Sequence, residues 1–353
     1  MSVIKKTYNE QYRETEYSLV KNNNMIYRIV FSIICIFFAL SVTAQQQVKK
    51  PVSIIFDSDI GPDYDDVGAI TMLHVMEESG DAKILATGAS NQYEGIAAVL
   101  NVFNTYFNRS EIPIGIPKGK GVNIRDSQHW TDTILAKYPH KIKFNNDVPD
   151  AVEIYRKALA AQPDHSVTIV TVGFLTNMAN LLNSTGDKYS PLNGKELIKK
   201  KVKQLVSMAG KFPSGNEFNV EKDAIASKNA LENWPTTIIF SGFEIGEKIK
   251  TGLPLIHNTK IKNSPTKDAF RISINISPED SAGRMSWDET AVFVAVKGYS
   301  PYYTLHQGKI KIADNGSNSW DENAKGQYYL VEKAAPKEME GIINNFIMQQ
   351  PKK

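Results

Sequence analysis

Residues 56–70 read FDSDIGPDYDDVGAI and join an apolar run to the start of a predicted helix. The stretch holds five aspartates within ten residues, from Asp57 to Asp66. Carboxylates this close repel one another, so a folded chain keeps them together only around a positive partner or in contact with water. The rest of the sequence indicates which of these applies.

Short apolar runs recur along the chain with helix-like segments between them. Because the runs are continuous rather than alternating, they are typical of strands buried on both faces. The order predicts an α/β fold, a mostly parallel open sheet with helices on both faces. The segments are strands at 52–57, 83–89, 112–117, 166–173, 203–210 and 236–242, and helices at 65–79, 94–107, 150–161, 175–184 and 223–233.

The C-terminal third follows a less regular pattern. Residues 286–298 predict a helix that ends at Gly298. The segments 302–313 and 326–333 predict a small antiparallel addition near the C-terminus.

An apolar run at 25–38, entered by Arg28 and followed by ALSVTA, is typical of a signal peptide cleaved after Ala44. We therefore expect a signal peptide with an N-terminal extension at 1–44 and one domain at 45–353. The polar, mixed-charge residues 1–24 suggest that translation starts at Met25. The protein is expected to be exported, periplasmic or secreted, with no stable membrane anchor after cleavage; an uncleaved anchor is the alternative.

The charge balance of the mature chain argues against functions that need a strongly basic surface. Subtracting the five basic and three acidic residues of 1–44 from the totals of 41 and 38 leaves 36 basic and 35 acidic residues. This near-neutral balance gives no electrostatic reason to expect a nucleic acid or an anionic lipid as partner. The only cysteine, Cys35, lies within the predicted signal peptide.

Polar residues follow the predicted strands, and in open α/β sheets ligands bind beyond the carboxyl ends of the strands. Helix capping explains Asp65 and Asp66, where the helix start favours ionised carboxylates with low pKa values. It does not explain Asp57 and Asp59 on the preceding strand end. Several carboxylates with no histidine or cysteine nearby suit calcium or magnesium.

An aspartate pair at the end of the first strand fits two chemistries. One is aspartyl phosphate transfer by a magnesium-dependent phosphatase similar to the haloacid dehalogenases. That chemistry needs a later acidic pair, which the other predicted strand ends lack. The second is the attack of a metal-activated water on a sugar.

Segments along the chain resemble, in order, those of the calcium-dependent nucleoside hydrolases. Residues 57–70 resemble the DxDxGxDDxxAI signature, with two additional residues in the turn before Asp65. The later matches are SNQYE (90–94), TVGFLTNMANLL (171–182), GNEFN (215–219) and SWDETAVFVAV (286–296). Together they cover residues 52–297 and imply the nucleoside hydrolase fold.

The resemblance also implies roles for individual residues. Asp59 would be the general base for a calcium-activated water. Asp57 would support the residues that contact the metal and the sugar without contacting either itself. The implied calcium ligands are Asp59, Asp66, the Val172 carbonyl and Asp288, and the implied ribose contacts are Asp65, Asn91, Glu217 and Asn219.

The chain departs from the family pattern at three places. The first turn carries the extra residues Pro62 and Asp63. The segment 210–217 is shorter than in the family, which leaves Asn216 as the candidate for the asparagine expected to hold the 5′-hydroxyl. Trp287 stands where the family has a histidine that protonates the leaving base. Trp287 either packs at the helix start or stacks on a purine. Arg284, nearby, either contacts the substrate or pairs with Asp280 or Glu279.

The resemblance thus implies hydrolysis of ribonucleosides, purines preferred, to ribose and free base with Ca²⁺ as cofactor. The expected partner is a small nucleoside or related glycoside, and a homo-oligomer is possible. A catalytically weak carbohydrate-binding protein of the same fold is the main alternative, and the phosphatase a lesser one.

Overall fold

The computed structural model describes residues 50–352, together with residues 13, 16–18, 21–22 and 25 near the N-terminus. The expected apolar run, the cleavage site after Ala44 and the domain start at residue 45 lie outside the described residues, apart from Met25 itself. No helix within the described part of the chain is long and apolar enough to cross a membrane.

A ten-stranded sheet forms the centre of this unit, in the order β3-β2-β1-β4-β5-β7-β12-β10-β11-β6. The first seven strands in this order, from β3 to β12, run parallel to one another, whereas β10, β11 and β6 continue the sheet with antiparallel pairings. The strands are β1 (Val52–Ser58), β2 (Ala82–Ala89), β3 (Ile114–Gly115), β4 (Val167–Thr171), β5 (Val202–Met208), β6 (Ser214–Gly215), β7 (Thr237–Ser241), β10 (Tyr303–Ile312), β11 (Asn318–Asp321) and β12 (Gln327–Glu332), with β8 (Lys250–Thr251) and β9 (Arg284–Met285) forming a separate pair.

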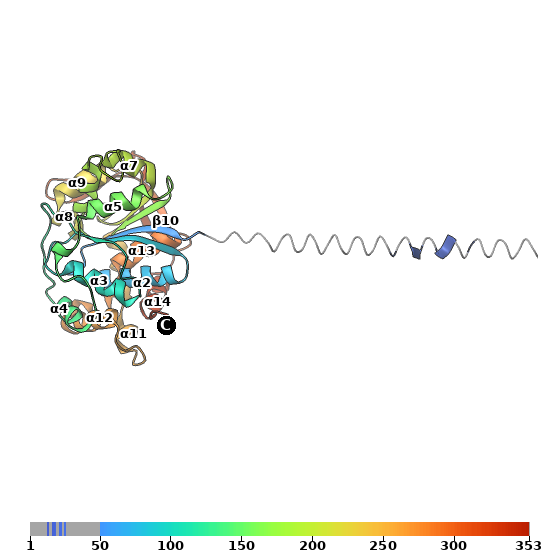
Figure 1. The fold of residues 1–353 in the computed structure, drawn as a ribbon, viewed down its shortest axis with the longest axis horizontal. Coiled ribbons are helices and arrows are strands. Elements are labelled where there is room, and N and C mark those ends of the chain that lie inside the picture. Colours follow the sequence, from blue (N-terminus) through green and yellow to red (C-terminus); the bar gives the residue numbers. More distant parts are fainter. Residues whose placement is uncertain (1–12, 14–15, 19–20, 23–24, 26–49, 353) are drawn as a thin grey trace, which may run out of the picture. The chain divides into compact units, whose positions relative to one another are not determined.

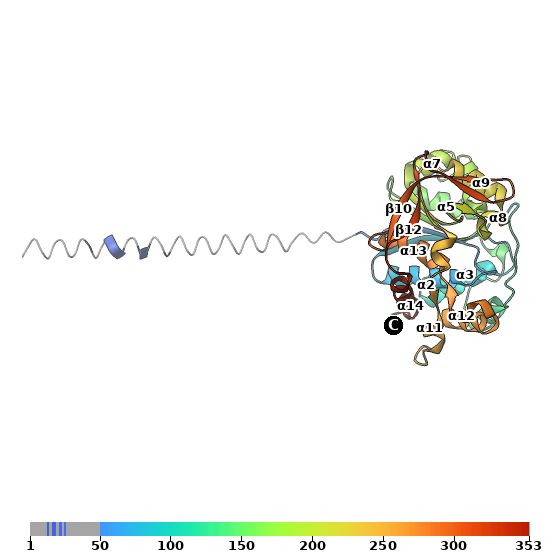
Figure 2. The ribbon, with the colours of Figure 1, turned by 180° about the vertical axis from the view of Figure 1, so that it is seen from behind.

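Helices cover both faces of the sheet (Figures 1 and 2). One face carries α5 (Ala151–Ala160), α6 (Thr176–Asn183), α7 (Gly194–Lys201) and α9 (Ala224–Asn233). The other carries α2 (Asp65–Glu78), α3 (Ile96–Tyr106), α13 (Trp287–Lys297) and α14 (Pro336–Ile347). The remaining helices are α4 (Trp130–Lys137), α8 (Phe218–Lys222), α10 (Phe243–Gly246), α11 (Leu253–His257) and α12 (Pro265–Ile276), with 3₁₀ turns at Asn145–Asp147 and Pro278–Asp280.

Strand β1 shows why its apolar run is continuous. Ile54 and Phe56 belong to the core on the α2 side, whereas Ile55 belongs to the core on the α5 side. All three side chains are fully buried. Each successive residue therefore has an apolar layer to enter, as expected for a strand covered on both faces.

The predicted mostly parallel fold and its small antiparallel addition are confirmed. The third strand was predicted at 112–117 but covers only Ile114–Gly115. Pro113 and Pro117 flank it and have no N–H to donate to a neighbouring strand, which explains its shortness. The helices that were not predicted are α4, α7, α8, α10, α11, α12 and α14.

Gly88, near the end of β2, allows a close contact between two layers. A Cβ atom there would lie 1.6 Å from the hydroxyl oxygen of Tyr155 in α5. That hydroxyl donates a 2.5 Å hydrogen bond to the buried carboxylate of Asp57. The contact ties α5 to the end of β1.

Replacing Gly88 with alanine should therefore displace Tyr155 and lower the free energy of unfolding by about 1–3 kcal/mol, the usual cost of overpacking a core. Denaturant titration measures this. Gly341→Ala in α14 is the matched control, because no heavy atom lies within 4 Å of the added Cβ and alanine favours a helix. Equal stability of the Gly88→Ala variant and the unchanged protein would contradict the packing argument.

Candidate functional site

A pocket of about 220 Å³ lies beyond the carboxyl ends of β1, β4 and β5. This volume is below the roughly 300–1,000 Å³ typical of sites for drug-sized ligands, so a small ligand fits it best. The pocket contains eight of the nine residues predicted for the site, all except Asn91. Its lining consists of Asp59, Asp63, Asp65, Asp66, Val172, Met208, Glu217, Phe218, Asn219, Phe243, Arg284, Trp287 and Asp288.

Four buried aspartates form the floor of the pocket. Asp59 follows β1, Asp65 and Asp66 open α2, and Asp288 lies in the first turn of α13. Carboxylate oxygens of Asp65, Asp66 and Asp288 lie within 4.8 Å of one another. Residues more than 200 positions apart in sequence therefore share one small volume.

Burial dominates the electrostatics of these carboxyls. It raises the pKa of Asp59, Asp65 and Asp288 well above the ordinary value, and the neighbouring carboxylates raise them further. Burial also raises the pKa of Asp66 to about 6. The expectation that a helix start keeps the pKa values of Asp65 and Asp66 low is wrong, because desolvation outweighs the helix dipole here.

The donor set fits a hard divalent cation. Asp66 accepts a 2.6 Å hydrogen bond from Ser58 through Oδ1, whereas its Oδ2 is buried without a hydrogen-bond partner. A Cβ on Gly173 would lie 2.2 Å from the Asp59 nitrogen, so the residues after β4 pack closely against Asp59. The lining offers carboxylate and carbonyl oxygens with no histidine or cysteine, the ligands that calcium and magnesium prefer.

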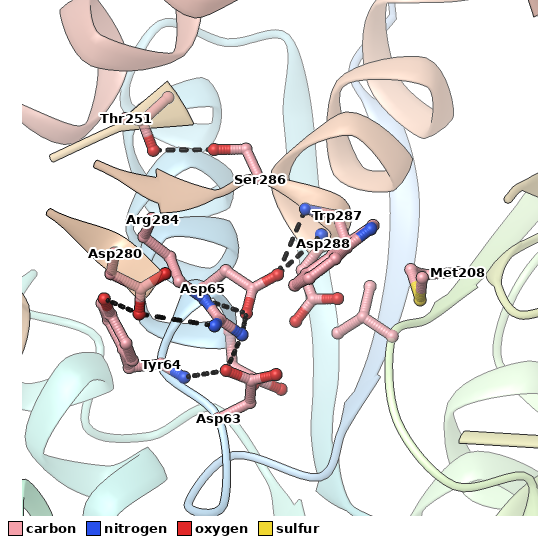
Figure 3. A network of polar contacts seen from close by, with 12 residues as sticks. Asp63, Tyr64, Asp65, Met208, Thr251, Asp280, Arg284, Ser286, Trp287 and Asp288 are labelled. Carbon is pink, nitrogen blue, oxygen red and sulfur yellow. Dashed lines mark hydrogen bonds and ion pairs between the residues drawn. The ribbon is translucent and has the colours of Figure 1, made fainter. Parts of the chain in front are cut away.

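Arg284 is the one cation among the lining residues, and Figure 3 shows its contacts. Its Nε and Nη2 lie 3.2 and 2.9 Å from Asp65 Oδ1, and it also pairs with Asp63. The predicted pairing with Asp280 is present at 3.7 Å. Burial lowers the pKa of Arg284 to about 10, so the guanidinium remains charged among the carboxylates.

Asp65 joins the starts of two helices. Its Oδ2 accepts hydrogen bonds from the backbone nitrogens of Trp287 and Asp288, at 3.2 and 3.3 Å, and its Oδ1 is held by Arg284. The beginning of α2 is thereby linked to the beginning of α13 (Figure 3). Both carboxylate oxygens already have partners within the chain.

The additional turn before Asp65 contributes to the pocket. Asp63 lies in the lining, and its Oδ1 accepts a 3.0 Å hydrogen bond from the Tyr64 nitrogen. Pro62 and Asp63 were identified from the sequence as additional residues, but no role was predicted for Asp63. Its pairing with Arg284 could not be inferred, because the partner lies more than 200 residues away.

Glu217 and Asn219 form the opposite wall. The Glu217 carboxylate accepts hydrogen bonds from the backbone nitrogens of Gly210, Asn219 and Val220, at 3.0, 2.8 and 3.2 Å. Burial raises the pKa of Glu217 to about 7. The Asn219 amide donates to the Val172 carbonyl at 3.1 Å, so the predicted sugar contacts adjoin the predicted metal ligands.

Aromatic side chains form the remaining wall. The Trp287 indole N–H donates a 2.8 Å hydrogen bond to the Phe243 carbonyl, and the two ring centroids lie 5.2 Å apart. Phe218 also lines the pocket and is 42% exposed. Met208, Phe218 and Phe243 were missed as site residues; only Phe218 carried a signal, its place inside the EFN segment.

Two predicted residues lie just outside the lining. Asn91 is fully buried and donates to the carbonyls of Asp59 and Ile124, at 3.3 and 2.8 Å. Asp57 accepts hydrogen bonds from Tyr155, Thr171 and Asn177. Both therefore support the turn around Asp59 in this structure.

The chain is similar in sequence to curated ribonucleoside hydrolases. The curated pyrimidine-specific ribonucleoside hydrolase RihA of Citrobacter koseri is 28% identical over 233 residues, which are 63% of this chain. The match spans just under two thirds of that relative, 66% of its length.

Solved structures share the fold. The plant nucleoside hydrolase PpNRh1 superposes with a TM-score of 0.67 at 15% identity, covering 84% of this chain and 99% of the plant chain. The purine-preferring ribonucleoside hydrolase of Gardnerella vaginalis gives a TM-score of 0.63 at 17% identity, over 84% and 99% of the two chains. The family model of the inosine-uridine preferring nucleoside hydrolases matches residues 54–339, and the chain therefore belongs to that family.

Proposed function

We propose that the protein hydrolyses the N-glycosidic bond of ribonucleosides, releasing ribose and a free base. One observation carries the proposal: the carboxylates of Asp59, Asp66 and Asp288 and the sugar-binding pair Glu217 and Asn219 line a single small pocket. Family membership supports the same reaction.

Calcium is the proposed cofactor, held by Asp59, Asp66, Asp288 and the Val172 carbonyl. When bound, such a cation orients a water molecule and lowers its pKa. Asp59 would serve as the general base toward the attacking water. The buried carboxylates stabilise the positive charge that develops on the sugar as the bond to the base breaks.

Glu217 and Asn219 orient the sugar in this proposal. Glu217 is fixed by three backbone N–H groups, and Asn219 by the carbonyls of Val172 and Met208. Such pre-formed acceptors and donors orient the hydroxyls of ribose without reorganisation. Asp65, whose oxygens already have partners, acts together with Arg284 to hold this side of the pocket.

We propose purine ribonucleosides as the preferred substrates. The support is the wall made by Trp287 and Phe243, because aromatic rings stack on the larger base. Relatives support different preferences: the curated relative is named pyrimidine-specific, whereas one solved structure is named purine-preferring. Substrate comparison therefore tests this part separately from the reaction itself.

Residues 45–353, with calcium, should release ribose from purine ribonucleosides and more slowly from pyrimidines, and a chelator should abolish release. Asp59→Asn should abolish turnover while the thermal unfolding curve recorded without calcium remains nearly unchanged. Ribose release is measured over a nucleoside panel. Release from no nucleoside, with ribose still bound, would favour the carbohydrate-binding alternative; chelator-resistant release would contradict the metal requirement.

Calcium should also stabilise the fold, because it binds the folded site and relieves carboxylate repulsion. A calcium concentration about 100 times Kd stabilises by about 2.7 kcal/mol. Thermal unfolding with calcium or chelator measures the shift. Asp66→Asn should lose most of it, whereas Asp132→Asn, in an exposed ion pair, should retain it; an equal shift in both variants would argue against the site.

The ionisation of Glu217 should appear in the pH dependence. Its pKa is raised to about 7, and the proposed acceptor role needs the ionised form, so kcat/KM should fall as the pH decreases below about 7. Glu217→Gln is neutral at every pH, so the ratio of wild-type to variant kcat/KM should shrink from about pH 8 to about pH 6. The measurement keeps calcium saturating; a constant ratio would refute the assignment.

A further inference from the structure

The loop of residues 210–217, between β5 and α8, carries Glu217 into the pocket. It begins at Gly210, whose left-handed φ of 80° suits glycine, and the Gly210 nitrogen donates a 3.0 Å hydrogen bond to Glu217 Oε2. The start of the loop is thus bonded to the carboxylate at its end. Any displacement of residues 210 and 211 would move a donor to Glu217.

Asn318, at the start of β11, forms two hydrogen bonds with the backbone of Lys211, the residue that follows Gly210. The Lys211 nitrogen donates to Asn318 Oδ1 at 2.9 Å, and Asn318 Nδ2 donates to the Lys211 carbonyl at 2.8 Å. Asn318 is only 4% exposed. This pair of bonds fixes both the position and the orientation of the backbone at Lys211.

Strand β11 also pairs with residues 214–215, near the end of the loop. Strand β6 lies antiparallel to β11, with Asn318 opposite Gly215 and Ser319 opposite Ser214. Between these two attachments, the Phe212 ring stacks on Tyr329 of β12 with centroids 4.8 Å apart and meets Trp320 edge-on at 5.2 Å. The loop is therefore held by β11 and β12 along most of its length.

The held loop reaches both recognition walls of the pocket. Its end presents Glu217. Near its start, the Lys211 ammonium lies 4.8 Å from the centroid of the Phe243 ring, which packs against Trp287. A shift of the loop would therefore alter the sugar contact and the aromatic wall together.

We propose that the C-terminal strand β11 clamps this loop for substrate binding, with Asn318 as the positioning residue. Asn318 does not line the pocket and acts through Lys211 and Gly210. This inference rests on the proposed function, because it takes the substrate bound by the loop to be a ribonucleoside. It assigns a role to the part of the chain after residue 298.

Asn318→Ala tests the clamp, with Gln327→Ala as the matched control. Gln327 in β12 is similarly buried, at 2% exposure, and also makes two main-chain bonds, to Leu231 and Ile310, neither of which belongs to residues 210–217. Asn318→Ala should raise KM about tenfold, or about 1.4 kcal/mol, with a smaller change in kcat. Gln327→Ala should lower Tm and leave KM unchanged.

Asn318→Asp provides a second variant: it keeps the acceptor for the Lys211 nitrogen and sets a carboxylate oxygen against the Lys211 carbonyl oxygen. Because two buried acceptors repel each other, its KM should be at least as high as that of Asn318→Ala. If the alanine variant fails to fold, the aspartate variant carries the comparison. A KM equal to that of Gln327→Ala in the variant tested overturns the positioning role.

Amide hydrogen exchange supplies a readout that needs no activity. Residues 210–217 should exchange faster in Asn318→Ala than in Gln327→Ala, and equal exchange overturns the clamp. If the wild type hydrolyses no nucleoside, the proposed function fails, and the exchange comparison still decides whether β11 holds the loop. If the wild type is active, the proposal requires two results: faster exchange of residues 210–217 and a higher KM in the Asn318 variant than in Gln327→Ala.

Discussion

Repulsion among buried carboxylates is the constraint on which the rest of the site depends. Asp59, Asp65, Asp66 and Asp288 are each at most 4% exposed, and like charges in a region of low dielectric disfavour joint ionisation. Arg284 and the backbone N–H groups at the start of α13 offset part of this cost at Asp65. Asp66 Oδ2 retains no such partner, so the cluster is suited to a divalent cation.

Close packing keeps these groups together despite their repulsion. Gly68 in α2 leaves room for the carboxylate of Glu289 in α13, which would lie 2.0 Å from a Cβ at that position. Gly173 brings the residues after β4 equally close to Asp59. The helices on one face and the strand ends thus act as a rigid frame. Because the frame is pre-formed, binding energy need not be spent on assembling the site.

The sequence predicted the parallel sheet, because each strand is a continuous apolar run, and most of the pocket, because its residues lie in ordered segments after strands. It did not predict the contacts between distant segments. The pairing of Asp63 with Arg284 and the packing of Phe243 on Trp287 depend on how β9, α10 and α13 meet. Asn91 was predicted to contact the ribose, whereas in the structure it lies outside the lining and donates to the main-chain carbonyls of Asp59 and Ile124, bonds that leave no local signature in the sequence.

The aspartate cluster is proposed to hold calcium beside a sugar pocket. A crystal structure of the protein grown with calcium, with anomalous scattering to identify the ion, tests this proposal. We expect one calcium ion bonded to Asp59, Asp66, Asp288 and the Val172 carbonyl, with the Arg284 contacts to Asp65 retained. A cluster that stays free of metal at saturating calcium, or an ion held by other residues, would contradict it.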